Sequence, residues 1–118
     1  MQIEGGKALL ETLRNVGFDV IVGGWTKSTD EGDWYLYIAS KDVDERGIAE
    51  AYGTIYTTIR ANPELFIDPF EVKLIGAQHP ITKDLLDTQG IRVAPNVLRS
   101  RRPKLGNMYV DDTYVYAM

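Results

Sequence analysis

The chain has 118 residues, a hydrophobic fraction of 44%, a charged fraction of 25% and a formal net charge of −4. This length suits one domain, and this composition excludes a wholly disordered chain, so we expect a single soluble domain over residues 1–118. The absence of cysteine excludes disulfides, thiolate metal sites and cysteine nucleophiles. Because no apolar run approaches the roughly 20 residues of a membrane span and no signal peptide is recognisable, we expect no membrane contact and a cytoplasmic location.

The first part of the chain predicts one helix and one β-hairpin. Four aliphatic residues between positions 9 and 16 recur at helical spacing, which predicts a helix over residues 6–16. Two runs rich in strand-forming residues follow, 18–25 and 34–39, with a polar turn segment between them. In the second run the even-numbered residues share one face and the odd-numbered residues the other. Gly23 and Gly24 indicate a bulge or a close approach of another part of the backbone.

A second helix is predicted after the hairpin. Asp42, with Glu45 three residues later, has the form of a capping box, and Asn62-Pro63 ends the helical pattern. An apolar stripe at helical spacing lies between these signals and consists of Ile48, Tyr52, Ile55, Tyr56 and Ile59. We therefore expect one helix from Asp42 to the residue before Asn62.

One more strand and one more helix are predicted in the next part of the chain. Residues 70–75 alternate in polarity, so we expect a strand whose even-numbered residues, beginning with Phe70, share one buried face. Pro80 is typical of a first helical position and begins a short helix that ends near residue 88. His79 is the only histidine of the chain, and its place before Pro80 favours a structural role at the start of this helix.

The C-terminal part has weaker patterns. Residues 91–93 predict a short strand, and residues 94–107 predict an exposed basic loop. Residues 108–116 have strand character around the polar pair Asp111-Asp112 and predict either a tight hairpin or one irregular edge strand. The fold class is therefore α+β, with a small mixed or antiparallel sheet of three to five strands. Two to three helices pack mainly on one face of it, in the order α-β-β-α-β-α followed by C-terminal strand material.

A Glu-x-Lys pattern on the third strand is the sharpest chemical signal. Glu71 and Lys73 fall on one strand face, and Asp68 lies just before them; such a set can hold Mg²⁺ and position a water for phosphodiester cleavage. The pattern resembles the core of the restriction-endonuclease-like nucleases. In that family the aspartate lies on a strand that pairs with the Glu-x-Lys strand, whereas Asp68 lies in a turn and Asp33 is the better-placed strand-end acid. The alternative is a solvated strand face; outside the nuclease hypothesis we predict no catalytic residue, metal or cofactor.

A basic run interrupts this acidic chain near its C-terminus. It contains Arg99, Arg101, Arg102 and Lys104. Such a loop suits phosphate contact, and the nearby Tyr109 could stack on a base, so nucleic-acid binding is a second functional hypothesis. The alternative is a solvated loop that pairs with acidic groups of the chain itself or of a partner protein.

Aromatic residues gather in the predicted hairpin and at the C-terminus. They are Trp25, Trp34, Tyr35, Tyr37, Tyr109, Tyr114 and Tyr116. A hairpin with two apolar faces exceeds what a chain of this size easily covers, and such residues are favoured at interfaces, so we expect a two-fold homodimer. With no complete catalytic constellation, the preferred hypothesis is a small non-enzymatic protein-binding or regulatory module with an unknown protein partner.

Overall fold

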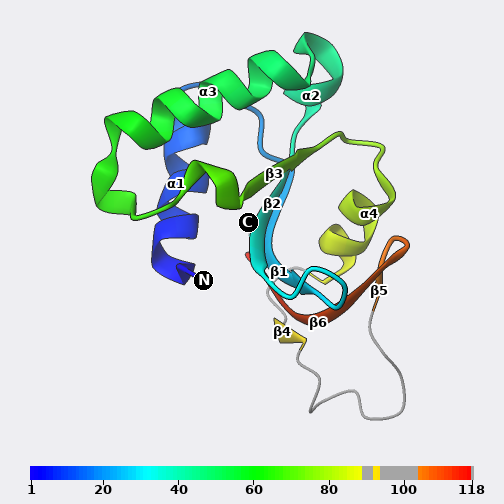
Figure 1. The fold of residues 1–118 in the computed structure, drawn as a ribbon. Coiled ribbons are helices and arrows are strands. Elements are labelled where there is room, and N and C mark those ends of the chain that lie inside the picture. Colours follow the sequence, from blue (N-terminus) through cyan, green and yellow to red (C-terminus); the bar gives the residue numbers. More distant parts are fainter. Residues whose placement is uncertain (89–91, 94–103, 118) are drawn as a thin grey trace.

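The computed structural model describes residues 1–88, 92–93 and 104–117, and its fold is mixed α+β, as the sequence predicts (Figure 1). The helices are α1 (Ile3–Asn15), α2 (Lys41–Arg46), α3 (Ile48–Ala61) and α4 (Pro80–Asp87). Two 3₁₀ turns are η1 (Pro63–Leu65) and η2 (Pro69–Glu71). The strands are β1 (Val22–Ser28), β2 (Trp34–Ala39), β3 (Val72–Ile75), β4 (Arg92–Val93), β5 (Lys104–Leu105) and β6 (Met108–Val115).

Five strands form one mixed sheet in the order β3-β2-β1-β6-β4, and β5 forms a short hairpin with β6. β1 and β2 are the antiparallel hairpin that the sequence predicts, and β3 adds to β2 in parallel. β6 pairs with both β1 and β4, so the expectation of an edge strand or a tight hairpin at residues 108–116 is wrong. The pairing register of β1 and β6 shifts at the polar pair Asp111-Asp112, opposite Lys27 and Ser28.

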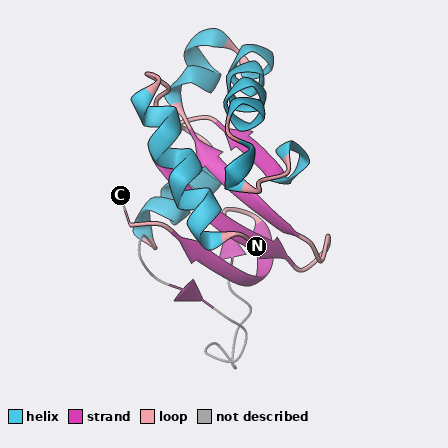
Figure 2. Ribbon diagram, turned by 90° about the vertical axis from the view of Figure 1, so that its left-hand side faces the viewer, coloured by secondary structure: helices cyan, strands magenta, loops and turns pink. Residues whose placement is uncertain are grey.

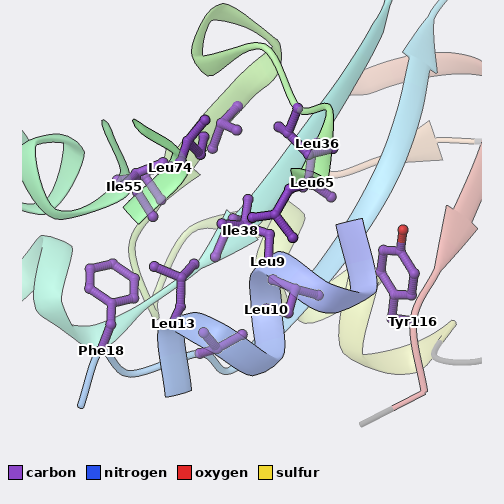
Figure 3. Packing of buried hydrophobic residues seen from close by; sticks show 14 of the residues in the cluster. Leu9, Leu10, Leu13, Phe18, Leu36, Ile38, Ile55, Leu65, Leu74 and Tyr116 are labelled. Carbon is purple, nitrogen blue, oxygen red and sulfur yellow. The ribbon is translucent and has the colours of Figure 1, made fainter. Parts of the chain in front are cut away.

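Each face of the sheet carries its own hydrophobic core. On one face the leucines of α1 pack with Leu36 and Ile38 of β2 and with Ile55 of α3 (Figure 3). On the opposite face Tyr37 and Ala39 pack with α4. The alternation predicted for the second strand is therefore confirmed. Three of the helices lie on one side of the sheet and α4 on the other (Figures 1 and 2).

Glycines in β1 allow the close packing that the sequence suggests. A Cβ atom on Gly23 would lie 2.7 Å from Cδ1 of Leu10 in α1, and one on Gly24 would lie 3.1 Å from the carbonyl oxygen of Tyr114 in β6. Both distances are shorter than ordinary carbon contacts. The predicted close backbone approach is thus confirmed at Gly24, whereas the close neighbour of Gly23 is the side chain of Leu10, which places α1 directly on the central strand.

The predicted helix over residues 42–61 is in fact two helices. α2 begins after Ser40, whose hydroxyl accepts a hydrogen bond from the Asp42 amide, so Asp42 is not the cap. Gly47 then adopts φ 90°, a conformation that side-chain-bearing residues rarely adopt, and it turns the chain between α2 and α3. Because α3 begins at Ile48 after this break, Ile48 is 52% exposed and does not belong to the predicted buried stripe.

Two further expectations need correction at the ends of strands. The strand predicted over residues 70–75 begins at Val72, because Pro69 opens the η2 turn, and Phe70 is 84% exposed instead of buried. The last residues of the loop predicted over 94–107 form the β5–β6 hairpin, in which Leu105 is buried. Residues 94–103 of that loop lie outside the described residues.

Candidate protein-binding surface

Of the three residues of the nuclease hypothesis, Asp68 and Glu71 belong to the η2 turn and Lys73 belongs to β3. The Asp68 carboxylate accepts a hydrogen bond from the Phe70 amide at 2.9 Å and thereby caps η2, which also contains Glu71. Lys73 lies on β3, and its Nζ is 3.0 Å from the Glu31 carboxylate and 4.0 Å from the centroid of the Tyr35 ring. Asp68 and Lys73 thus each have a partner that explains their position without a metal site.

The electrostatics separate Lys73 from Glu71 in the same way. Partial burial raises the pKa of the Glu71 carboxyl, and the negative charge of Asp68 raises it further. Burial lowers the pKa of the Lys73 ammonium, but the hydrogen bond to Glu31 and the nearby tyrosines outweigh burial and raise it. Among the described residues no group of three or more histidine, aspartate or glutamate side chains could hold a metal ion.

Part of the basic run is visible beside the C-terminal strand. Arg99, Arg101 and Arg102 lie outside the described residues. Lys104 is exposed on β5, and its Nζ lies 4.6 Å from the centroid of the Tyr109 ring, itself 44% exposed. The structure therefore brings together one cation and one accessible aromatic ring.

Of the seven aromatic residues expected at an interface, only Tyr109 is exposed. Three of them are buried, namely Trp25, Tyr37 and Tyr116. Three more are half-buried, namely Trp34, Tyr35 and Tyr114. The buried three belong to the core because their polar atoms find partners within the chain; Trp25 Nε1, for example, donates to the Tyr116 hydroxyl at 3.0 Å.

His79 has the structural role that the sequence favours. Its side chain caps α4, because Nδ1 accepts a hydrogen bond from the amide of Ile81 at 3.1 Å. Pro80 occupies the first helical position, where a missing amide hydrogen is tolerated.

A groove between α3 and the two 3₁₀ turns is the candidate functional site. We call it the Phe70 groove; its volume is about 600 Å³, and it is lined by Tyr56, Ile59, Arg60, Pro63, Ile67, Pro69 and Phe70. In Figure 1 the green segment after α3 turns back beneath this helix before it enters β3. Phe70 also lines a second hollow, of about 390 Å³, together with Trp34, Tyr35 and Glu71.

Two phenylalanines project from this segment because the backbone around them is fixed. Pro63 and Pro69 start the two 3₁₀ turns, in which proline sets the backbone angle φ. Phe66, between the turns, has φ 53°, and this left-handed conformation allows both its neighbours, Leu65 and Ile67, to be buried. As a result Phe66 is 77% exposed, and Phe70 after the second turn is 84% exposed.

None of the residues that line this groove was predicted as a site from the sequence, although the chain carries a signal for it. The two prolines in residues 62–70 predict a turn segment. Four of these nine residues are nevertheless large and apolar. Turn segments normally carry small polar residues. In this apolar turn Leu65 and Ile67 are buried, whereas Phe66 and Phe70 are exposed.

Charges surround the groove but do not pair across it. Arg60, the one charged residue in the groove lining, is exposed and makes no ion pair with any residue that the structure describes. Glu64 and Asp68 are exposed on the same segment as the two phenylalanines. The groove therefore has an apolar floor and a rim with both signs of charge.

The neighbouring edge of the sheet is closed by the chain itself. β3 is an edge strand, and such strands commonly accept a further strand from a partner. Its amides at Val72 and Leu74 bond outside the sheet: the first donates to the carbonyl oxygen of Pro69 and the second to the hydroxyl of Tyr52 at 2.9 Å. These two amides of the edge strand are therefore already engaged within the chain.

Comparison with known proteins gave no match to a family model, a curated protein or a solved structure. In the described part of the chain no helix has the length and apolar character that a membrane crossing requires.

Proposed function

We propose that this chain is a non-enzymatic protein-binding module and that the Phe70 groove is its contact surface. The observation that carries the proposal is the exposure of Phe66 and Phe70 beside an apolar groove. Burying a phenylalanine side chain is worth about 1.5–3 kcal/mol, so two projecting rings leave a large favourable free energy to a partner. Clustered exposed apolar residues of this kind typically mark interaction sites.

The composition of the groove favours a polypeptide over a small substrate. Small-molecule sites place several polar groups so that they converge on the ligand. Here the charged lining is Arg60 alone, and the other lining side chains are mostly aliphatic, proline or aromatic. Interfaces between proteins, by contrast, have an apolar centre with aromatic residues and a polar rim, which describes this surface.

Selection of peptides from a random library tests the proposal. Peptides selected on sparsely immobilised wild-type chain should carry large apolar residues, and Phe70→Ser should weaken their binding about tenfold or more, because the groove loses its projecting wall. Ile48→Ser is the matched control, since Ile48 is an exposed apolar residue at the other end of α3. Fluorescence anisotropy with each labelled peptide measures both effects. Equal binding to wild type and Phe70→Ser would contradict the proposal.

A second candidate function is binding of single-stranded nucleic acid at Lys104 and Tyr109. The supporting observation is that an exposed cation and an exposed ring lie together next to the basic segment. We expect labelled oligouridine RNA to bind more weakly as salt rises, and Lys104→Glu and Tyr109→Ala to weaken it further, as measured by anisotropy. Lys7→Glu, on the exposed face of α1, is the control. Absence of binding at low salt would remove this candidate.

A further inference from the structure

We propose that the occupant of the Phe70 groove is a second copy of this chain, arranged with two-fold symmetry so that Phe66 of each copy enters the groove of the other. This inference rests on the function proposed above and names the partner. It is also more specific than a general tendency to dimerise, because it assigns the contact to α3, η1 and η2.

The first argument is the shape of the surface. In a two-fold dimer the same patch meets itself, so the patch must contain both a projection and a hollow that receives it. Phe66 is the projection, 77% exposed, and the groove of about 600 Å³ is the hollow. Leu65 and Ile67, buried on either side of Phe66, hold the projection at a fixed distance from the groove. A partner with a different fold needs only one of these two features.

The second argument is charge complementarity. Arg60 lines the groove without an acidic partner in the described part of the chain, and Glu64 is exposed beside the projecting Phe66. When Phe66 of one copy enters the groove of the other, Glu64 arrives next to Arg60 of the other copy. Two-fold symmetry repeats this contact between Arg60 and Glu64, so the dimer has two interfacial ion pairs at the rim of the groove.

The third argument is the backbone conformation of Phe66. A bulky residue with φ 53° is uncommon, and glycine, asparagine or aspartate adopt this conformation more readily. Nothing in the folding of one chain requires an aromatic ring at this position, because the ring is mostly exposed. Contact with a second chain gives the ring a function.

The experiment is the mass of the full chain in solution as a function of concentration. Sedimentation equilibrium of the wild type should show a change from 13.3 kDa to twice that mass as concentration rises. Phe66→Asn should weaken the dimer about thirtyfold or more while the monomer stays folded, because asparagine suits the left-handed conformation. Val16→Asn is the matched control, since Val16 is 61% exposed after α1, and it should leave the dimer intact.

A charge exchange tests the pairing itself. Arg60→Glu and Glu64→Lys should each dimerise several-fold more weakly than the wild type, because each homodimer then opposes like charges. An equimolar mixture of the two variants should recover dimerisation. In the mixed dimer one contact joins Arg60 of one copy to Glu64 of the other, as in the wild type, and the second contact joins the two substituted residues, which also have opposite charges. Neither substitution removes a buried side chain, so folding is expected to be unaffected.

The outcomes separate this inference from the function on which it rests. Measurements up to about 0.1 mM would reveal a dimer with a micromolar Kd. A wild-type chain that stays at 13.3 kDa over this range would overturn the proposed self-association. If selected peptides still bind through Phe70 in that case, the proposed function stands and the partner is a different protein. A dimer that survives both Phe66→Asn and Arg60→Glu would assign the contact to another face and would equally overturn the inference.

Discussion

At the scale of single residues, Tyr116 joins the two ends of the described chain. Its hydroxyl accepts a hydrogen bond from Trp25 Nε1 at 3.0 Å and donates one to the carbonyl oxygen of Ile3 at 2.5 Å. Gly6 makes this possible, because a Cβ atom there would clash with the Tyr116 hydroxyl and lie 2.8 Å from Trp25 Nε1. One buried hydroxyl thus fixes the end of β6 against the start of α1 and the centre of β1.

Burial raises the pKa of Tyr116 to about 12, which predicts a loss of stability at high pH. In the unfolded chain a tyrosine ionises near pH 10, so above that pH the unfolded state loses a proton that the folded state keeps. The contribution of Tyr116 to the free energy of unfolding should therefore be fully present below about pH 10. It should fall by about 2–3 kcal/mol as pH rises to about 12.

Tyr116→Phe should reduce this pH dependence, because the titrating hydroxyl is absent. At neutral pH the variant should be about 1–3 kcal/mol less stable, since Trp25 Nε1 loses its acceptor. Urea unfolding at several pH values measures both effects, and Tyr109→Phe, a change at an exposed ring, should follow the wild-type curve. A variant with the full wild-type pH dependence would contradict the assignment to Tyr116.

At the scale of elements, α3 contacts the sheet on one side and lines the Phe70 groove with its C-terminal half. Its buried side, which includes Ile55, packs on the sheet. Tyr52, on the same helix, reaches the edge of the sheet, where its hydroxyl accepts a hydrogen bond from the Leu74 amide. The break at Gly47 sets where α3 begins, and it thereby determines which residues of the helix reach the sheet and which reach the groove.

Tyr52→Phe should open the edge strand β3. The Leu74 amide loses its acceptor, so we expect a loss of about 1 kcal/mol in stability and faster hydrogen exchange at Leu74. Tyr56→Phe is the matched control on the same helix, because the Tyr56 hydroxyl makes no hydrogen bond within the described part of the chain. Amide exchange followed by NMR measures the effect; an unchanged rate at Leu74 in Tyr52→Phe would show that the hydroxyl does not close the edge.

At the scale of the whole molecule, the chain closes through pairing between distant segments. β6 lies beside β1, about ninety residues away in sequence, with Trp25 opposite Tyr114 and Thr26 opposite Thr113. The hydroxyls of the two threonines lie 2.9 Å apart within the sheet. Helices cover both faces of the sheet, α1 and α3 on one side and α4 on the other. The groove lies at the margin of this arrangement, beside β3.

The sequence by itself determined the features that depend on local order. The faces of β2, the start of α4 at Pro80 and the capping role of His79 follow from alternation and backbone preference. These properties act between residues that are close in sequence, so local sequence patterns predict the features that depend on them. The α+β class follows from the same patterns.

The tertiary structure alone decided the pairing partners and the surface. β6 looked like an edge because its polar pair Asp111-Asp112 marks a bulge only when β1 lies opposite. Phe70 looked buried because alternation does not show that η2 replaces the first residues of the strand. The groove and its projecting Phe66 arise where α3, η1 and η2 meet, since exposure is a property of the packed chain and no short-range pattern encodes it.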